Sequence, residues 1–103
     1  MQLAVVAGKE KGRIYKLQLA KTLVIGRAKD CDIVLDDAKI SKRHAEMELS
    51  KNSIIVYDLD SKNSTYVNGV PIQGRHKLDD EDTLLMGETE LRLRFDKDEI
   101  FAG

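Results

Sequence analysis

The chain has 103 residues and a formal net charge of −1, and this length suits one compact domain. Hydrophobic residues make up 42% and charged residues 34%, which is typical of a globular protein rather than a disordered one. The near-neutral charge argues against binding nucleic acid over a broad surface. Aromatic residues, at 5% with no Trp, are too few for a base-stacking platform.

Cys31 is the only cysteine of the sequence, so no intramolecular disulfide can form and we expect a reducing, cytoplasmic setting. No apolar run approaches the roughly 20 residues that a membrane-spanning helix needs. The apolar start, Met1–Gly8, is too short for a signal peptide and lacks a basic first region. We therefore expect no direct membrane contact by this domain.

The first half of the chain alternates between short apolar segments and turns. Ala45, Met47 and Leu49 alternate with polar residues, as in a strand with one buried face. A turn at Lys51-Asn52 joins this segment to the next and predicts a hairpin. The apolar or alternating segments of this half are residues 3–7, 14–19, 22–25, 33–35, 45–49 and 54–57.

The second half continues the same rhythm of strand and turn. Asn68-Gly69 is a strong hairpin signal, because both residues tolerate positive φ. Leu91, Leu93 and Phe95 share one face of an alternating segment that starts at Glu90. The other segments are residues 65–67, 70–72 and 83–86. No segment keeps apolar residues at helical spacing, so the pattern predicts an all-β sandwich or barrel.

Polar residues gather on the predicted loops rather than on the strands, where binding sites usually lie. Arg27 carries a planar, permanently charged fork that matches a phosphate, and Ser41 offers a hydroxyl donor. Further positive charge comes from Lys39, Lys42, Arg43 and Lys62. This cluster, in a chain that is slightly acidic overall, favours a small anionic ligand over a long polyanion.

A serine hydrolase is one alternative reading, with Ser41 as nucleophile, His44 as base and Asp58 or Asp60 as the group that orients it. The sequence contains no nucleophile elbow, and the pair lies inside the basic segment. We therefore expect no enzymatic activity.

A thiol pair or a metal site is a second alternative. Cys31 lies beside apolar Ile33, where a cysteine is more often a small core residue than a reactive thiol. Cys31, His44 and His76 show no metal-ligand spacing. We therefore expect neither a metal nor a cofactor.

Four motifs occur in order along the chain: Gly26-Arg27, Ser41-Lys-Arg-His44, Ser61-Lys-Asn-Ser-Thr65 and Val67-Asn-Gly69. In this order and at this spacing they resemble the signature of the forkhead-associated (FHA) family. The flanking segments Cys31-Asp-Ile33, Leu35-Asp36 and Leu84-Leu-Met-Gly87 resemble the family as well. The resemblance covers most of the chain, from about Thr22 to Gly87.

The resemblance implies an eleven-stranded β-sandwich whose loops at one end hold a phosphothreonine peptide. Carried over residue by residue, Arg27 and Ser41 contact the phosphate and Lys42 is a further donor to it. Lys62 is placed where a side chain often reaches the phosphate. Asn63 hydrogen-bonds the peptide backbone beside the phosphothreonine.

The same resemblance assigns structural support of the site to a second set of residues. They shape the loops rather than touch the ligand. They are Gly26, His44, Thr65, Asn68 and Gly69.

The sequence departs from the family pattern at two positions. Ser64 replaces the usual Gly between Asn63 and Thr65, and Glu81 replaces a Gly that often precedes the residue matched by Asp82. One hypothesis keeps Ser64 at the positive φ of the family Gly, with some strain. The other gives Ser64 an ordinary negative φ, with its hydroxyl capping the turn.

The function that follows from the resemblance is recruitment of a phosphothreonine-containing partner in Ser/Thr-kinase signalling. The alternative is a phosphate-independent adaptor that uses the same sandwich. We expect the domain to span residues 1–95 and the charged segment 96–103 to be a frayed tail or linker. The sequence leaves the oligomeric state open, and a monomer is the simpler expectation.

Overall fold

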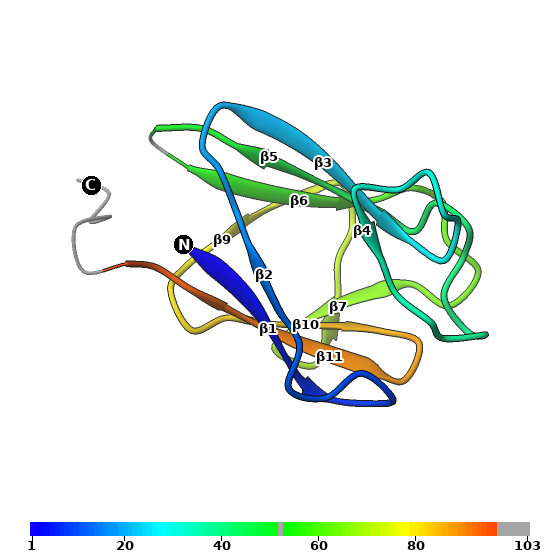
Figure 1. The fold of residues 1–103 in the computed structure, drawn as a ribbon. Helices are drawn as coiled ribbons and strands as arrows, with labels where there is room; N and C mark the ends of the chain where they lie inside the picture. The colour runs from blue at the N-terminus through cyan, green and yellow to red at the C-terminus, as the bar shows by residue number, and fades with distance from the viewer. Residues whose placement is uncertain (52, 97–103) are drawn as a thin grey trace.

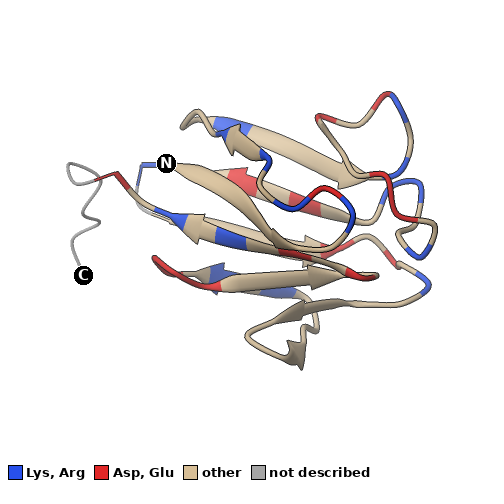
Figure 2. Cartoon of the chain, turned by 60° about the horizontal axis from the view of Figure 1, so that its bottom comes forward, with Lys and Arg blue, Asp and Glu red and all other residues tan. Residues whose placement is uncertain are grey.

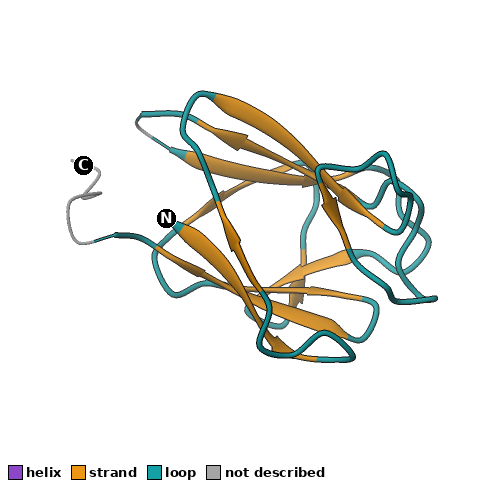
Figure 3. Cartoon of the chain, in the orientation of Figure 1, coloured by secondary structure: helices purple, strands orange, loops and turns teal. Residues whose placement is uncertain are grey.

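The computed structural model describes residues 1–51 and 53–96. Within them the chain forms strands and loops and no helix (Figure 3). The strands are β1 (Gln2–Ala7), β2 (Ile14–Lys16), β3 (Lys21–Gly26), β4 (Ile33–Val34), β5 (Ala45–Leu49), β6 (Ile54–Asp58), β7 (Thr65–Val67), β8 (Val70–Pro71), β9 (Arg75–Leu78), β10 (Thr83–Met86) and β11 (Thr89–Arg94).

The strands form two sheets that lie face to face (Figure 1). The six-stranded sheet has the order β2-β1-β11-β10-β7-β8, and the five-stranded sheet has the order β4-β3-β5-β6-β9. The paired strands are antiparallel except β3 and β4, which run parallel. The predicted all-β sandwich with eleven strands is confirmed.

The core lies between the sheets and follows the predicted alternation. Ala45, Met47 and Leu49 are fully or almost fully buried, while the intervening glutamates are not. Leu91 and Leu93 of β11 are fully buried from the opposite sheet. Burial of a Leu or Met side chain stabilises a fold by about 1.5–3 kcal/mol relative to exposure, so these alternating positions fix which face of each strand turns inward.

The strand β9 is the element that the apolar pattern did not reveal. Only its last residue, Leu78, is buried, so its sequence shows no alternation. It pairs with β6 at the edge of the five-stranded sheet, where charged residues such as Arg75 and Lys77 hinder pairing with other chains. The hairpin of β5 and β6 is confirmed, although Asn52 of its predicted turn lies outside the described residues, as do residues 97–103 of the predicted tail.

The loops that follow β3, β4 and β6 lie at the end of the sandwich away from the N-terminus (Figure 1). Cys31 in the first of these loops is buried and has a free thiol. In the described part of the chain, no helix is long and apolar enough to span a membrane.

Candidate functional site

Gly26, the last residue of β3, allows two loops to approach closely. A Cβ placed on Gly26 would lie 2.2 Å from the carbonyl oxygen of Lys42. The backbone amides of Arg27 and Ala28 donate to the carbonyls of Ser41 and Lys42, each at 3.1 Å. The β4–β5 loop (residues 35–44) is therefore held flat against the β3–β4 loop (residues 27–32), with no room for a side chain at Gly26.

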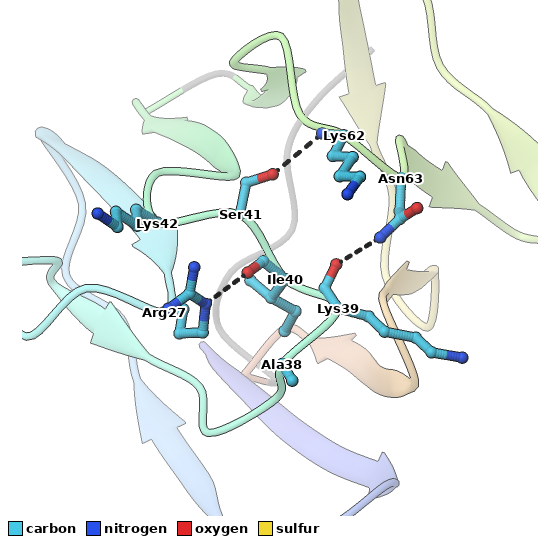
Figure 4. A pocket seen from close by; sticks show the side chains of 8 residues that line it. All are labelled: Arg27, Ala38, Lys39, Ile40, Ser41, Lys42, Lys62 and Asn63. Carbon is cyan, nitrogen blue, oxygen red and sulfur yellow. Dashed lines mark hydrogen bonds between the residues drawn. The ribbon is translucent and has the colours of Figure 1, made fainter.

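A pocket of about 660 Å³ opens where these two loops meet the β6–β7 loop (residues 59–64). The five residues that the sequence predicted to bind all line it: Arg27, Ser41, Lys42, Lys62 and Asn63 (Figure 4). Ala38, Lys39 and Ile40 complete the lining. The residues assigned to structural support do not line the pocket.

One nitrogen of the Arg27 guanidinium is bound within the protein, and the other two are available to a ligand. Its Nε donates to the carbonyl of Ile40 at 3.0 Å (Figure 4). Within residues 1–51 and 53–96, its two η nitrogens have no hydrogen-bond partner, and the side chain is exposed. The guanidinium is thus fixed in orientation and keeps two parallel donors for a ligand.

His44 is fully buried and sets the orientation of the peptide between Ile40 and Ser41. The amide of Ser41 donates to Nδ1 of His44 at 3.0 Å, so Nδ1 is unprotonated and Nε2 carries the hydrogen. Nε2 donates to the carbonyl of Ser64 at 2.8 Å. Because the Ser41 amide and the Ile40 carbonyl belong to one planar peptide, His44 also aims the carbonyl that holds Arg27.

Two hydrogen bonds join the β4–β5 and β6–β7 loops across the pocket (Figure 4). The amide of Lys62 donates to the hydroxyl oxygen of Ser41 at 3.0 Å. Nδ2 of Asn63 donates to the carbonyl of Lys39 at 2.8 Å. Ser41 therefore keeps its own O–H for a ligand, and Asn63 keeps its side-chain carbonyl and its second N–H.

The carboxylate of Asp58 holds the β6–β7 loop in shape. It accepts hydrogen bonds from the amide and the hydroxyl of Ser61 and from the hydroxyl of buried Thr65 at 2.7 Å. Partial burial would raise the pKa of Asp58, but the hydrogen bonds from Ser61 and Thr65 outweigh it and hold the pKa below its ordinary value. Thr65 thus anchors the loop that carries two of the pocket residues.

The hydrolase geometry considered from the sequence is not present in these loops. Nδ1 of His44 is occupied by the backbone amide of Ser41 rather than by its hydroxyl. Nε2 lies 3.9 Å from Asp58, too far for a hydrogen bond. The thiol of Cys31 donates to the carbonyl of Lys42 at 3.1 Å, and burial raises its pKa, as expected for a packing cysteine. No group of three metal-ligand side chains occurs among the described residues.

Ser64 has a φ of 65°, so the hypothesis of a negative φ is wrong and the hypothesis of positive φ is confirmed. The hydroxyl of Ser64 makes no hydrogen bond within the described residues. Glu81, the second departure from the family pattern, also has a positive φ, 71°. Both side chains occupy a backbone region that favours Gly.

Asn68 and Gly69 form the predicted turn between β7 and β8, with φ of 50° and 84°. The side chain of Asn68 donates to Asp82 at 2.9 Å and accepts the amide of Thr83 at 3.0 Å. These bonds join the turn to the start of β10. The structure therefore brings Asn68 and Gly69 to a hairpin of the scaffold and not to the pocket.

Basic and acidic residues are interleaved along the loops at this end of the sandwich (Figure 2). Lys39 pairs with Glu88 at 2.9 Å, and Arg43 pairs with Asp30 at 3.4 Å. Lys42 and Lys62 form no ion pair within the part of the chain that the structure describes. The pocket therefore presents a positive charge that intramolecular pairing leaves uncompensated.

Comparison with known proteins identifies the scaffold. Residues 23–87 match the model of the FHA domain. The glycogen accumulation regulator GarA of Mycobacterium tuberculosis is 44% identical over 70 residues, which are 68% of this chain and 43% of GarA. The chain thus matches less than half the length of that relative.

Solved structures agree with the sequence match. An FHA domain from a study of phosphothreonine-dependent FHA domain interactions superimposes with a TM-score of 0.81 and 30% identity, over 93% of this chain and 98% of that one. EmbR of Mycobacterium tuberculosis, in complex with a low affinity phosphopeptide, gives a TM-score of 0.79 and 31% identity over 99% of this chain and 25% of EmbR. The sandwich, the order of the motifs and these matches show that the chain belongs to the FHA domain family.

Proposed function

We propose that this protein binds phosphothreonine peptides and so recruits phosphorylated partners in Ser/Thr-kinase signalling. The observation that carries the proposal is the state of Arg27, which lines the pocket and whose Nε donates to Ile40, while its η nitrogens have no partner among the described residues. A solvent-exposed guanidinium held at one nitrogen is prepared for a two-pronged contact with an anion.

Phosphate suits the pocket in charge and in hydrogen bonding. A phosphothreonine carries a charge of about −1.5 to −2 near pH 7 and presents three acceptor oxygens. Arg27 and the hydroxyl of Ser41 supply oriented donors, and Lys42 and Lys62 supply ammonium donors on long side chains. Asn63 has the remaining donor and acceptor to hydrogen-bond the backbone of the peptide.

Recognition, rather than catalysis, follows from this arrangement. The pocket holds charged and polar donors, and the histidine nearest to it is used to fix the loops. Two relatives support the reading, since one solved FHA domain comes from work on phosphothreonine-dependent interactions and another is bound to a phosphopeptide. We infer a non-enzymatic binding module.

The extent of the domain and its setting also stay proposals. The strands run from Gln2 to Arg94, which supports a domain of residues 1–95 followed by a tail. The cytoplasmic setting expected from the single cysteine, and the monomeric state, stay predictions.

The test is a screen with a degenerate phosphothreonine peptide library, followed by titration of the selected peptide and its unphosphorylated twin. Arg27→Ala should lower the affinity by at least about tenfold, since a charged hydrogen bond contributes about 1.5–3 kcal/mol. Arg27→Lys should restore little, because an ammonium lacks the planar fork. Arg43→Ala is the matched control, since Arg43 is exposed, pairs with Asp30 and does not line the pocket.

Equal affinity for the phosphorylated and unphosphorylated peptides would favour the phosphate-independent adaptor. Unchanged binding by Arg27→Ala, with the phosphorylated peptide still preferred, would place the phosphate elsewhere on the surface.

A further inference from the structure

Asp37 lies outside the pocket and joins the β4–β5 loop to the turn between β10 and β11. Its Oδ1 accepts the amide of Lys39 at 2.9 Å, within its own loop. Its Oδ2 accepts the amide of Glu88 and the hydroxyl of Thr89, both at 2.8 Å, from the turn. Partial burial would raise the pKa of Asp37, but the hydrogen bonds from Lys39, Glu88 and Thr89 outweigh it and hold the pKa below its ordinary value.

The turn is shaped to receive this carboxylate. A Cβ on Gly87, whose φ is +57°, would lie 2.9 Å from each carboxylate oxygen of Asp37. From the other side, a Cβ on Gly8 would lie 3.0 Å from the carbonyl of Glu88. Thr89 is almost fully buried. The turn is therefore packed on two sides and forms a firm anchor for Asp37.

The backbone of Asp37 contacts the peptide that joins Lys39 to Ile40. Its own carbonyl accepts the amide of Ile40 at 3.0 Å. The Ile40 amide and the Lys39 carbonyl belong to one trans peptide, so this carbonyl points to the opposite side. There it accepts a hydrogen bond from Nδ2 of Asn63 at 2.8 Å. The carbonyl of Ile40, one peptide further on, accepts Nε of Arg27.

We propose that Asp37 is a positioning residue of the pocket, whose carboxylate anchors the β4–β5 loop so that two successive carbonyls aim Arg27 and Asn63. The role of Asp37 in ligand affinity rests on the proposed function. Its role in aiming the two side chains does not, because these hydrogen bonds join groups of the protein itself.

Electrostatics alone gives the opposite expectation for the removal of this charge. Asp37 is an anionic group on the loop that lines a pocket for a dianion, so neutralising it should strengthen phosphate binding. If Asp37 acts by positioning, its neutralisation should weaken binding instead. The sign of the effect therefore separates the two roles.

The experiment compares Asp37→Asn with Asp36→Asn by titration with the selected phosphothreonine peptide. Asp36 is the matched control, because its side chain is 72% exposed and, among the described residues, pairs only with Lys9, at 2.8 Å, so the same charge is removed one residue away. Asp37→Asn replaces one acceptor oxygen by an NH₂ group, which faces a hydrogen-bond donor whichever way the amide is oriented, and should weaken binding by about fivefold to tenfold. Asp36→Asn should leave the affinity unchanged or slightly tighter.

Thr89→Val covers the case in which Asp37→Asn does not fold. It removes one hydrogen bond to Asp37 without a change of charge, and it should weaken binding by about twofold to threefold. Binding by folded Asp37→Asn that is as tight as, or tighter than, wild type would overturn the role in affinity. If only Thr89→Val folds, unchanged affinity of that variant would do so.

A second measurement needs no ligand. The ¹H–¹⁵N signals of Arg27 Nε and Asn63 Nδ2 report the two hydrogen bonds that Asp37 is proposed to aim. Both signals should move in Asp37→Asn or Thr89→Val and stay in place in Asp36→Asn. Signals that stay in place in every folded variant would overturn the positioning role. A wild-type protein that binds no phosphopeptide would defeat the proposed function and leave this measurement decisive for Asp37.

Discussion

Replacing Gly26 by Ala should loosen the loops of the pocket, and the structure sets the scale of the effect. The new Cβ would lie 2.2 Å from the carbonyl oxygen of Lys42, 2.8 Å from its carbonyl carbon and 3.0 Å from Cα of Arg43. All three atoms belong to backbone. Gly26 cannot retreat, because β3 is paired with β4 on one side and with β5 on the other. The β4–β5 loop must therefore move away by roughly an ångström to reach ordinary contact distance.

That movement breaks the hydrogen bonds that depend on close approach. The amides of Arg27 and Ala28 lose the carbonyls of Ser41 and Lys42, and the thiol of Cys31 loses the carbonyl of Lys42. Each such bond contributes about 1 kcal/mol net, so the variant should be less stable by about 2–3 kcal/mol. In a domain of this size, that loss lowers Tm by about 10–20 °C.

Thermal denaturation followed by circular dichroism measures the effect, with Gly74→Ala as the control. Gly74 has a φ of +67° and open space around its Cβ position, so its substitution introduces backbone strain without a collision. That strain should cost about 1 kcal/mol. A Gly26→Ala variant that melts no lower than Gly74→Ala would refute the argument from close approach.

Other expectations concern the loops and the ligand. Ser64→Gly should keep or raise Tm by a few degrees, because it relieves a positive φ and removes no hydrogen bond of the described residues. Gly also adds entropy to the unfolded chain, which limits the gain. A clear drop of Tm in a melting experiment would contradict this prediction. The affinity for the phosphopeptide, measured by fluorescence anisotropy, should weaken as the pH falls through about 6, where the phosphate takes up its second proton. The depressed pKa of Asp58 contributes stability that is present above the unfolded pKa of about 3.9 and is lost as the pH falls through the folded pKa. Because Asp58→Asn lacks this carboxylate, urea denaturation should show a smaller loss of its stability on acidification than for wild type.

The fold was predictable where one face of a strand is buried and the other is not. In β5 and β11 the alternation of apolar and polar residues matches the alternation of buried and exposed positions. In β9 only Leu78 is buried, so the sequence shows no alternation of apolar and polar residues. The strand forms by backbone pairing with β6. Backbone pairing at a sheet edge leaves little trace in the order of side chains.

The residues around the pocket were predictable from motifs, but the way in which they are held was not. The carbonyl of Lys39 accepts a hydrogen bond from Asn63, and the carbonyl of Ile40 accepts one from Arg27. The direction of a backbone carbonyl cannot be predicted from residue types alone. Asp36 and Asp37 are the same residue type with different roles. Asp36 is largely exposed and forms an ion pair with Lys9. Asp37 accepts three hydrogen bonds from two segments. Only the tertiary structure distinguishes them.

Hydrogen bonds within the protein organise the pocket, and this organisation separates two classes of variant. Arg27 and Asn63 are each tied to a carbonyl of the β4–β5 loop, so little side-chain entropy remains to be lost when a peptide binds. Substitution of a residue that contacts the ligand, such as Arg27, should lower affinity with little change in Tm. Substitution of a residue that positions the loops, such as Gly26 or Asp37, should lower both affinity and Tm. A variant of Gly26 or Asp37 that lost affinity at unchanged Tm would mean that these residues act on the ligand directly, and not through the loops.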